Sequence, residues 1–210
     1  MSPRLYVETN FVMSVAKGQD ADAELLLAFA ESQRVELCLP EVCVMETFKV
    51  WERERRGTAS LTRRLQKHID DYKRRQTALG PSAAAILDNA RVQADKQMNS
   101  VRGRAARCIQ RIATHGRLIA LSRRWAADGA EPRVIPSEPD DMILASVVEH
   151  ARNEPEKHVG FATKNTKDFG DKAAVLGELA SAGIKPFRSI GSALEWVTAL
   201  SDAARPRESQ

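Results

Sequence analysis

A strand, a helix, a second strand and a second helix follow one another in the first fifty residues, and this order most constrains the fold. An apolar strand begins at Leu5, and residues 21–32 repeat their apolar side chains at helical spacing. Residues 34–39 form a second strand that Pro40 ends, and residues 41–51 resume a helical pattern. Alternating elements of this kind predict a parallel sheet with crossover helices.

The alternation continues in the last third of the chain. Residues 142–152 have the apolar spacing of a helix, and residues 159–163 form the next buried strand. The remaining predicted elements are an extended piece at 134–135, a helix at 173–181, a strand at 184–187 and a helix at 191–200.

Two long helical segments separate these halves. Residues 52–79 are basic, with a narrow apolar stripe formed by Leu61, Leu65, Ile69 and Tyr72. Residues 83–114 repeat apolar side chains three or four apart, which favours packing along another helix. These segments predict an antiparallel hairpin, with a short helix after it at 118–127. We therefore expect an α/β domain from residues 1–51 and 131–200, an inserted hairpin at 52–130 and a flexible tail at 201–210.

Charge is distributed unevenly along the chain. Residues 52–130 contain 18 Lys or Arg and 7 Asp or Glu, a net +11, whereas the remainder carries −7. A basic segment beside an acidic remainder indicates a partner with phosphates. The alternative explanation for these basic residues is that they form a solvated helical face and bind no partner. The predicted nucleic-acid contacts are Arg63, Arg64, Lys67, Lys73, Arg74 and Arg75.

Composition predicts where in the cell the protein is located. The chain has 210 residues and three cysteines in no metal-binding spacing, which predicts buried, reduced thiols in a cytoplasmic protein. No apolar run approaches 18 residues, so no transmembrane helix and no membrane partner are expected. The N-terminus lacks the pattern of a signal peptide.

Acidic and amide side chains recur where a strand ends or the next helix begins. Ligands bind beyond the carboxyl ends of strands in open α/β sheets. Each cluster also has a plainer reading, as a helix cap, a first-turn acid, a surface glutamate or a loop residue. The clusters are Glu8 with Thr9 and Asn10, then Glu46, then Asp140 with Asp141, and then Asn165 with Asp168.

Carboxylates that converge repel one another unless cations neutralise them. Hard divalent cations with oxygen ligands, Mg²⁺ or Mn²⁺, suit such a site. A bound cation of this kind lowers the pKa of a water and stabilises charge at a scissile phosphate. The sequence therefore predicts metal-assisted hydrolysis of phosphodiesters if the clusters meet.

These motifs resemble those of PIN-domain nucleases. Residues 6–10 (YVETN) are similar to the family's opening motif, apolar–Asp-Thr-Asn, and Glu46 to its helical glutamate. Residues 141–145 (DMILA) are similar to its third motif, and residues 162–169 (ATKNTKDF) resemble its fourth, Thr-x-Asn-x-x-Asp-Phe. The matching segments cover residues 4–50 and 133–198.

The resemblance implies a Rossmann-like three-layer α/β/α sandwich with a parallel central sheet. It also implies a Mg²⁺ or Mn²⁺ site and an endoribonuclease, with RNA favoured over DNA. Glu8, Glu46, Asp141 and Asp168 would hold the metal, with Asp140 as an outer candidate, while Asn10, Thr163 and Asn165 would orient water or phosphate. Many family members are toxins of toxin–antitoxin pairs, and many form homodimers, so an antitoxin or a second copy is an implied partner.

Two departures leave alternatives open. Glu8 stands where the family has Asp, and compact members lack the inserted hairpin. A non-catalytic nucleic-acid-binding or scaffold protein on the same fold is therefore the competing hypothesis. The hairpin itself is predicted to bind either phosphates or a partner protein, and its apolar side chains leave dimerisation open.

Overall fold

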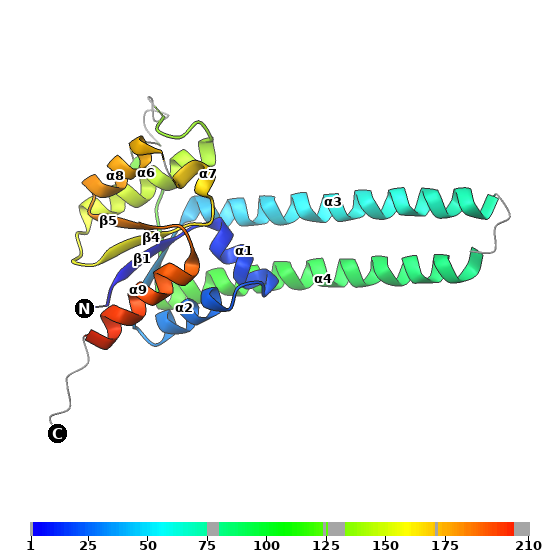
Figure 1. Cartoon of the computed structure of the whole chain (residues 1–210), viewed down its shortest axis with the longest axis horizontal. Helices are drawn as coiled ribbons and strands as arrows, with labels where there is room; N and C mark the ends of the chain where they lie inside the picture. The colour runs from blue at the N-terminus through cyan, green and yellow to red at the C-terminus, as the bar shows by residue number, and fades with distance from the viewer. Residues whose placement is uncertain (1, 75–79, 124, 126–132, 171, 204–210) are drawn as a thin grey trace, which may run out of the picture. The chain divides into compact units, whose positions relative to one another are not determined.

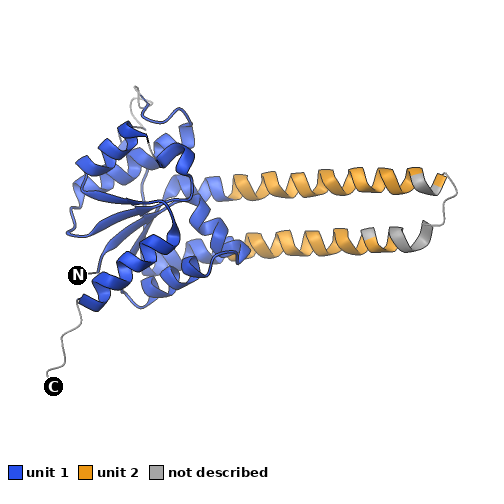
Figure 2. Cartoon of the chain, viewed as in Figure 1, with its two compact units in different colours: residues 1–47, 105–210 blue, residues 48–104 orange. Residues whose placement is uncertain are grey.

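The computed structural model describes residues 2–74, 80–123, 125, 133–170 and 172–203. The chain divides into two compact units, residues 1–47 with 105–210 and residues 48–104 (Figure 2). The first unit contains a five-stranded parallel sheet in the order β3-β2-β1-β4-β5. The predicted parallel sheet is confirmed.

β1 (Arg4–Val7) lies at the centre of this sheet. It pairs with β2 (Glu36–Pro40) on one side and with β4 (Val159–Ala162) on the other. β3 (Arg117–Ile119) and β5 (Ile184–Phe187) form the two edges. Leu5, Tyr6 and Val7 are fully buried, as expected for a strand covered on both faces.

Helices cover both faces of the sheet (Figure 1). α2 (Ala21–Glu31) and α9 (Ile190–Ala203) contact each other on one face, beside α1 (Thr9–Lys17). α6 (Glu138–Asn153) and α8 (Ala173–Ser181) cover the other face. α7 (Thr166–Phe169) is a single turn after β4. This is the three-layer α/β/α sandwich that was predicted.

α3 (Glu41–Arg74) and α4 (Gly80–His115) provide the hairpin. The domain boundary predicted after residue 51 lies within one helix, because α3 continues without interruption from the end of β2. Trp51 Nε1 donates to Met98 O at 2.8 Å, which joins the two helices within residues 48–104. The guanidinium of Arg102 lies 5.2 Å from the centre of the Trp51 ring.

The predicted packing of the two apolar stripes of the hairpin is only partly correct. Val101 and Ala105 are buried, as are Cys108 and Ile112 further along α4. Leu61 and Leu65, however, are 56% and 44% exposed. Tyr72 and Leu87 have side chains outside the described set.

Two predictions between α4 and α6 need correction. Residues 117–119 form β3 and pair with β2, so the helix expected over 118–127 is wrong at its start, although Arg123 and Trp125 are helical. Residues 134–135 form bends and not an extended strand. Residues 105–123 and 125 belong to the sheet-containing unit, although they were predicted to lie in the insertion. Residues 126–132, and residues 204–210 of the predicted tail, lie outside the described residues.

The thiols of Cys38, Cys43 and Cys108 are free and buried, as predicted. Among the helices of the described part of the chain, none combines the length and apolarity needed to cross a membrane.

Candidate functional site

Glu8 lies at the carboxyl end of β1 and is only 3% exposed. It is the N-cap of α1, and its Oε2 accepts the backbone N–H of Asn10 at 2.7 Å. Thr163 Oγ1 donates to Glu8 Oε1 at 3.2 Å. Val7 and Ala162 are register partners on adjacent parallel strands, so Glu8 and Thr163 leave the sheet at the same edge.

The electrostatic environment of Glu8 is unusual. Burial raises the pKa of Glu8 to about 7, although hydrogen bonds from Asn10 and Thr163 oppose this rise. Among the described residues, no Lys, Arg or His forms an ion pair with Glu8. Burial of this carboxyl group costs less free energy when the group is protonated or when a cation binds beside it.

Glu46 joins the same edge from α3. The hydroxyl of Thr9 donates to Glu46 Oε2, which connects the first motif to the helical glutamate. Glu46 is half-buried and belongs to the unit that contains the sheet. The other carboxylate oxygen of Glu46 has no hydrogen-bond partner among the described residues.

The turn after β4 connects the other acidic clusters. Thr163 Oγ1 accepts the backbone N–H of Asn165 at 2.9 Å. Asn165 Nδ2 donates to Asp140 Oδ1 at 3.1 Å, and Asn165 Oδ1 accepts the backbone N–H of Asp168 at 3.3 Å. Hydrogen bonds therefore run from Glu8 through Thr163 and Asn165 to Asp140.

Asp141, the next residue on α6, has a different environment. It is 3% exposed, and its Oδ1 accepts the backbone N–H groups of Val134 and Ile135, each at 2.9 Å. Its Oδ2 accepts Trp125 Nε1–H at 3.2 Å. Both oxygens of Asp141 are thus engaged with the segment before α6, whereas Asp140 Oδ2 has no partner among the described residues.

Two lysines that were not predicted lie among these residues. Lys172 Nζ is 3.2 Å from Asp168 Oδ1. Burial alone would raise the pKa of Asp168, but hydrogen bonds from Lys172 and Asn165 outweigh it and lower that pKa. Lys164 Nζ lies 2.5 Å from Asp20 Oδ2 and donates to Ser14 Oγ at 3.1 Å. Of the two, only Lys172 had a signal in the sequence, its position four residues after Asp168.

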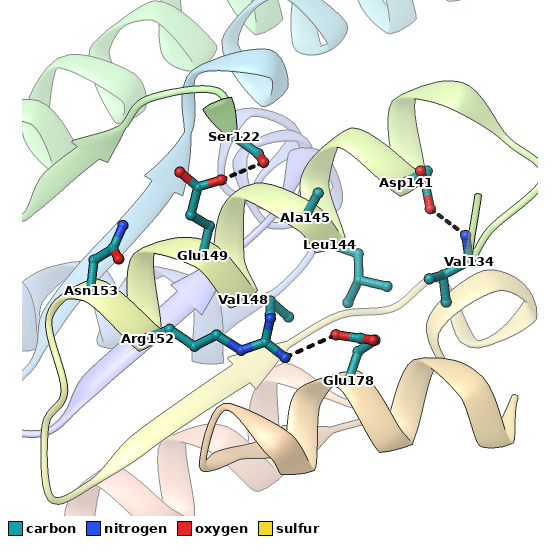
Figure 3. Close-up of a pocket in the computed structure, with 10 residues that line it drawn as sticks. All are labelled: Ser122, Val134, Asp141, Leu144, Ala145, Val148, Glu149, Arg152, Asn153 and Glu178. Atoms are coloured by element: carbon teal, nitrogen blue, oxygen red, sulfur yellow. Dashed lines mark hydrogen bonds and ion pairs between the residues drawn. The ribbon is translucent and has the colours of Figure 1, made fainter. Parts of the chain in front are cut away.

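A cavity of about 170 Å³ lies along α6, beside the hydrogen bond between Val134 and Asp141 (Figure 3). Asp141 lines one end of it, and Arg152 pairs with Glu178 at 3.1 Å near the other. Neither Glu8, Glu46, Asp140 nor Asp168 lines this cavity. The cavity therefore lies next to Asp141 and apart from the other four carboxylates.

The chemistry of the donors suits a hard cation. Glu8, Glu46, Asp140 and Asp168 supply carboxylate oxygens, and Glu8 is buried without a paired cation. Oxygen ligands of this type are those that Mg²⁺ and Mn²⁺ prefer. Within the described residues, no three His, Cys, Asp or Glu side chains already surround a common point closely enough to hold an ion.

The comparison with known families agrees with this arrangement. The profile of a PIN domain family matches residues 5–169, which is most of the chain. The chain belongs to the PIN-domain family. PIN domains are generally divalent-metal-dependent nucleases that use Mg²⁺ or Mn²⁺, typically on RNA, so membership implies a nucleic-acid substrate. No curated protein matches the sequence.

The hairpin of this PIN-domain protein carries the predicted nucleic-acid contacts. Arg63, Arg64 and Lys67 are exposed. Arg74 is also exposed and pairs with Asp71 at 2.7 Å. Arg75, and the side chain of Lys73, lie outside the described residues.

Proposed function

We propose that this PIN-domain protein is a divalent-metal-dependent endoribonuclease. The observation that carries the proposal is the chain of hydrogen bonds at the carboxyl edge of the sheet. It links Glu8, Thr163, Asn165 and Asp140, with Glu46 joined through Thr9 beside Glu8. Four segments far apart in the sequence thereby contribute oxygen ligands to one edge.

Four carboxylates would hold the metal in this proposal: Glu8, Glu46, Asp140 and Asp168. The metal, when bound, supplies an activated water and stabilises charge on the scissile phosphate. Thr163 and Asn165 position Glu8 and Asp140 through their hydrogen bonds, and Asn10 stays exposed beside Glu8. Lys172 balances the charge of Asp168 until a cation does so.

The assignment of the third motif changes from the one made on sequence alone. Asp141 was predicted as a metal ligand and Asp140 as an outer candidate of the same site. The hydrogen bonds favour the reverse, because Asp140 contacts Asn165 while both oxygens of Asp141 bind the segment before α6. We therefore propose Asp140 as a metal ligand and Asp141 as a structural residue.

A non-catalytic nucleic-acid-binding protein is the second candidate. The observation that favours it is the raised pKa of Glu8, because a protonated Glu8 competes with metal binding near neutral pH. This candidate predicts binding of RNA that survives chelation and no cleavage with any divalent metal.

Cleavage of a labelled RNA by the purified protein, in Mg²⁺, Mn²⁺ or EDTA, tests the proposal. Cleavage that needs metal and disappears in Asp140→Asn supports the endoribonuclease. A DNA oligonucleotide of the same sequence tests the preference for RNA. If the enzyme is the toxin of a toxin–antitoxin pair, its expression arrests growth and Asp140→Asn relieves the arrest.

A further inference from the structure

The outer face of α3 concentrates positive charge. Residues 48–104 contain 14 Lys or Arg and 6 Asp or Glu, a net charge of +8. Residues 55–69 include five Lys or Arg and no Asp or Glu. This stretch therefore has no acidic side chain of its own that could neutralise it along the helix.

Helical geometry places the basic residues together. Arg56, Arg63, Lys67 and Arg74 are spaced 7, 4 and 7 residues apart. At 3.6 residues per turn they fall within a stripe about 40° wide, which runs for roughly 27 Å along the helix axis. All four side chains are exposed. Arg64 lies next to the stripe and is exposed as well.

The middle of the stripe has no neutralising partner. Among the described residues, no carboxylate forms an ion pair with Arg63, Arg64 or Lys67, and Arg63 donates only to Ala59 O, at 3.4 Å. The ends differ, because Arg56 pairs with Glu52 at 2.9 Å and Arg74 pairs with Asp71. Such exposed ion pairs contribute little to stability, so a phosphate can replace the carboxylate at low cost.

The composition of the stripe favours phosphates over a protein surface. Gly57 and Ser60 lie beside it, and the exposed apolar residues Leu61 and Leu65 are on the opposite side of the helix. Protein interfaces have apolar or aromatic centres, and this stripe contains no apolar or aromatic side chain. A second copy of the hairpin would also repel a charge of +8.

We infer that this face of α3 binds the phosphate backbone of the nucleic acid, independently of its sequence. The inference rests on the proposed function, which makes nucleic acid the ligand. It assigns the contacts with the phosphates to Arg63, Arg64 and Lys67. One phosphate follows every 3.4 Å or so along each strand of a duplex, so the stripe is long enough to contact several. Binding through such contacts depends steeply on salt.

The test measures binding of a labelled 30-nucleotide RNA in EDTA between 50 and 200 mM KCl. The variant is Arg63→Gln/Arg64→Gln/Lys67→Gln, since glutamine retains helix propensity. The matched control is Arg107→Gln/Lys157→Gln/Lys185→Gln, which removes the same charge from exposed positions of the sheet-containing unit. Circular dichroism verifies that both variants keep their helix content.

The variant should bind at least tenfold more weakly at 50 mM KCl, with a log Kd against log salt slope shallower by about 2. The control should bind like the wild type. Equal binding and slope in the variant, an equal loss in the control, or no binding by the wild type would each overturn the inference. Metal-dependent cleavage is scored separately: loss of binding in the variant without cleavage by the wild type contradicts the endoribonuclease alone.

Discussion

Asp140 and Asp141 are neighbours on α6 with contrasting surroundings. Asp140 is half-buried and contacts the amide of Asn165, whereas Asp141 is buried and accepts three N–H groups. A helix turns about 100° per residue, so adjacent side chains point in different directions. One of them can therefore face the candidate site while the other anchors a neighbouring segment.

Substitution separates these roles. Asp140→Asn should abolish metal-dependent cleavage and leave the free energy of unfolding within about 0.5 kcal/mol of the wild type. Asp141→Ala should cost about 3 kcal/mol, because three N–H groups lose a buried acceptor. Asp141→Asn should cost less, since its oxygen can still accept from Val134 and Ile135. Urea denaturation and a cleavage assay measure the two effects, and a stable but inactive Asp141→Ala would reverse the assignment.

Glu8 should make stability depend on pH. Its pKa of about 7 in the folded protein exceeds the ordinary value of 4.5, so the folded state binds more protons between these values. Without metal, the stability that comes from protonated Glu8 is present below pH 4.5 and is lost as the pH rises through 7. The loss reaches up to about 3 kcal/mol at 1.36 kcal/mol per pKa unit.

Glu8→Gln is the control for this prediction, because it keeps a neutral side chain of similar shape at every pH. In EDTA, the free energy of unfolding should decrease from pH 5 to pH 8, and this decrease should be larger for the wild type than for Glu8→Gln. The comparison of the two proteins removes the contributions of other groups, among them His150, whose pKa burial lowers. An identical pH dependence in both proteins would show that Glu8 ionises normally.

At the scale of single residues, the candidate site was predicted from spacing together with the family resemblance. Glu8 and Asn165 were placed at strand ends by the apolar segments before them, and Thr163 was named from the resemblance. Hydrogen bonds join the three as neighbours. The sequence did not indicate which of Asp140 and Asp141 faces the candidate metal site. The choice depends on the backbone N–H groups of residues 134 and 135, whose conformation no periodicity reveals.

Gly116 decides how α4 meets the sheet. A Cβ at this position would lie 2.2 Å from Leu37 O in β2. Because that atom belongs to the backbone of a central element, it cannot move aside as a flexible side chain would. The glycine therefore allows the helix to end directly against the sheet and β3 to begin one residue later.

Gly116→Ala should lower the free energy of unfolding by about 2 kcal/mol or more, because of this overlap. Gly177→Ala, in α8, is the matched control, since a Cβ there meets nothing within 4 Å. It should raise stability by about 0.5–1 kcal/mol, because alanine favours a helix. Thermal or urea unfolding distinguishes them, and a neutral Gly116→Ala would mean that the close approach is not needed.

The elements that the sequence predicted poorly are short or interrupted. β3 has only three residues, too few for an alternating pattern, and a helical spacing of apolar residues follows it. The domain boundary expected after Trp51 reflected a change in charge, whereas the backbone continues there as one helix. The strands of four or five residues were predicted from their apolar runs and α9 from its helical spacing, and their positions were close to those observed.

The whole molecule combines a parallel sheet with acidic side chains at its carboxyl edge. If these hold a cation only in the folded state, the cation must stabilise the fold. Mn²⁺ at about 100 times its Kd should raise the free energy of unfolding by about 2.7 kcal/mol. Asp140→Asn should lose most of this gain, whereas Asp141→Asn should retain it. An equal gain in all three proteins would place the bound metal elsewhere.

Metal-dependent cleavage of RNA is the most direct test of the account. Wild-type protein, Asp140→Asn and Asp141→Asn would be incubated with one labelled RNA in Mg²⁺, Mn²⁺ or EDTA. Cleavage by the wild type and Asp141→Asn in metal, with none in EDTA or by Asp140→Asn, is the predicted result. Cleavage that persists in EDTA or in Asp140→Asn, or RNA binding without cleavage in any metal, would contradict it.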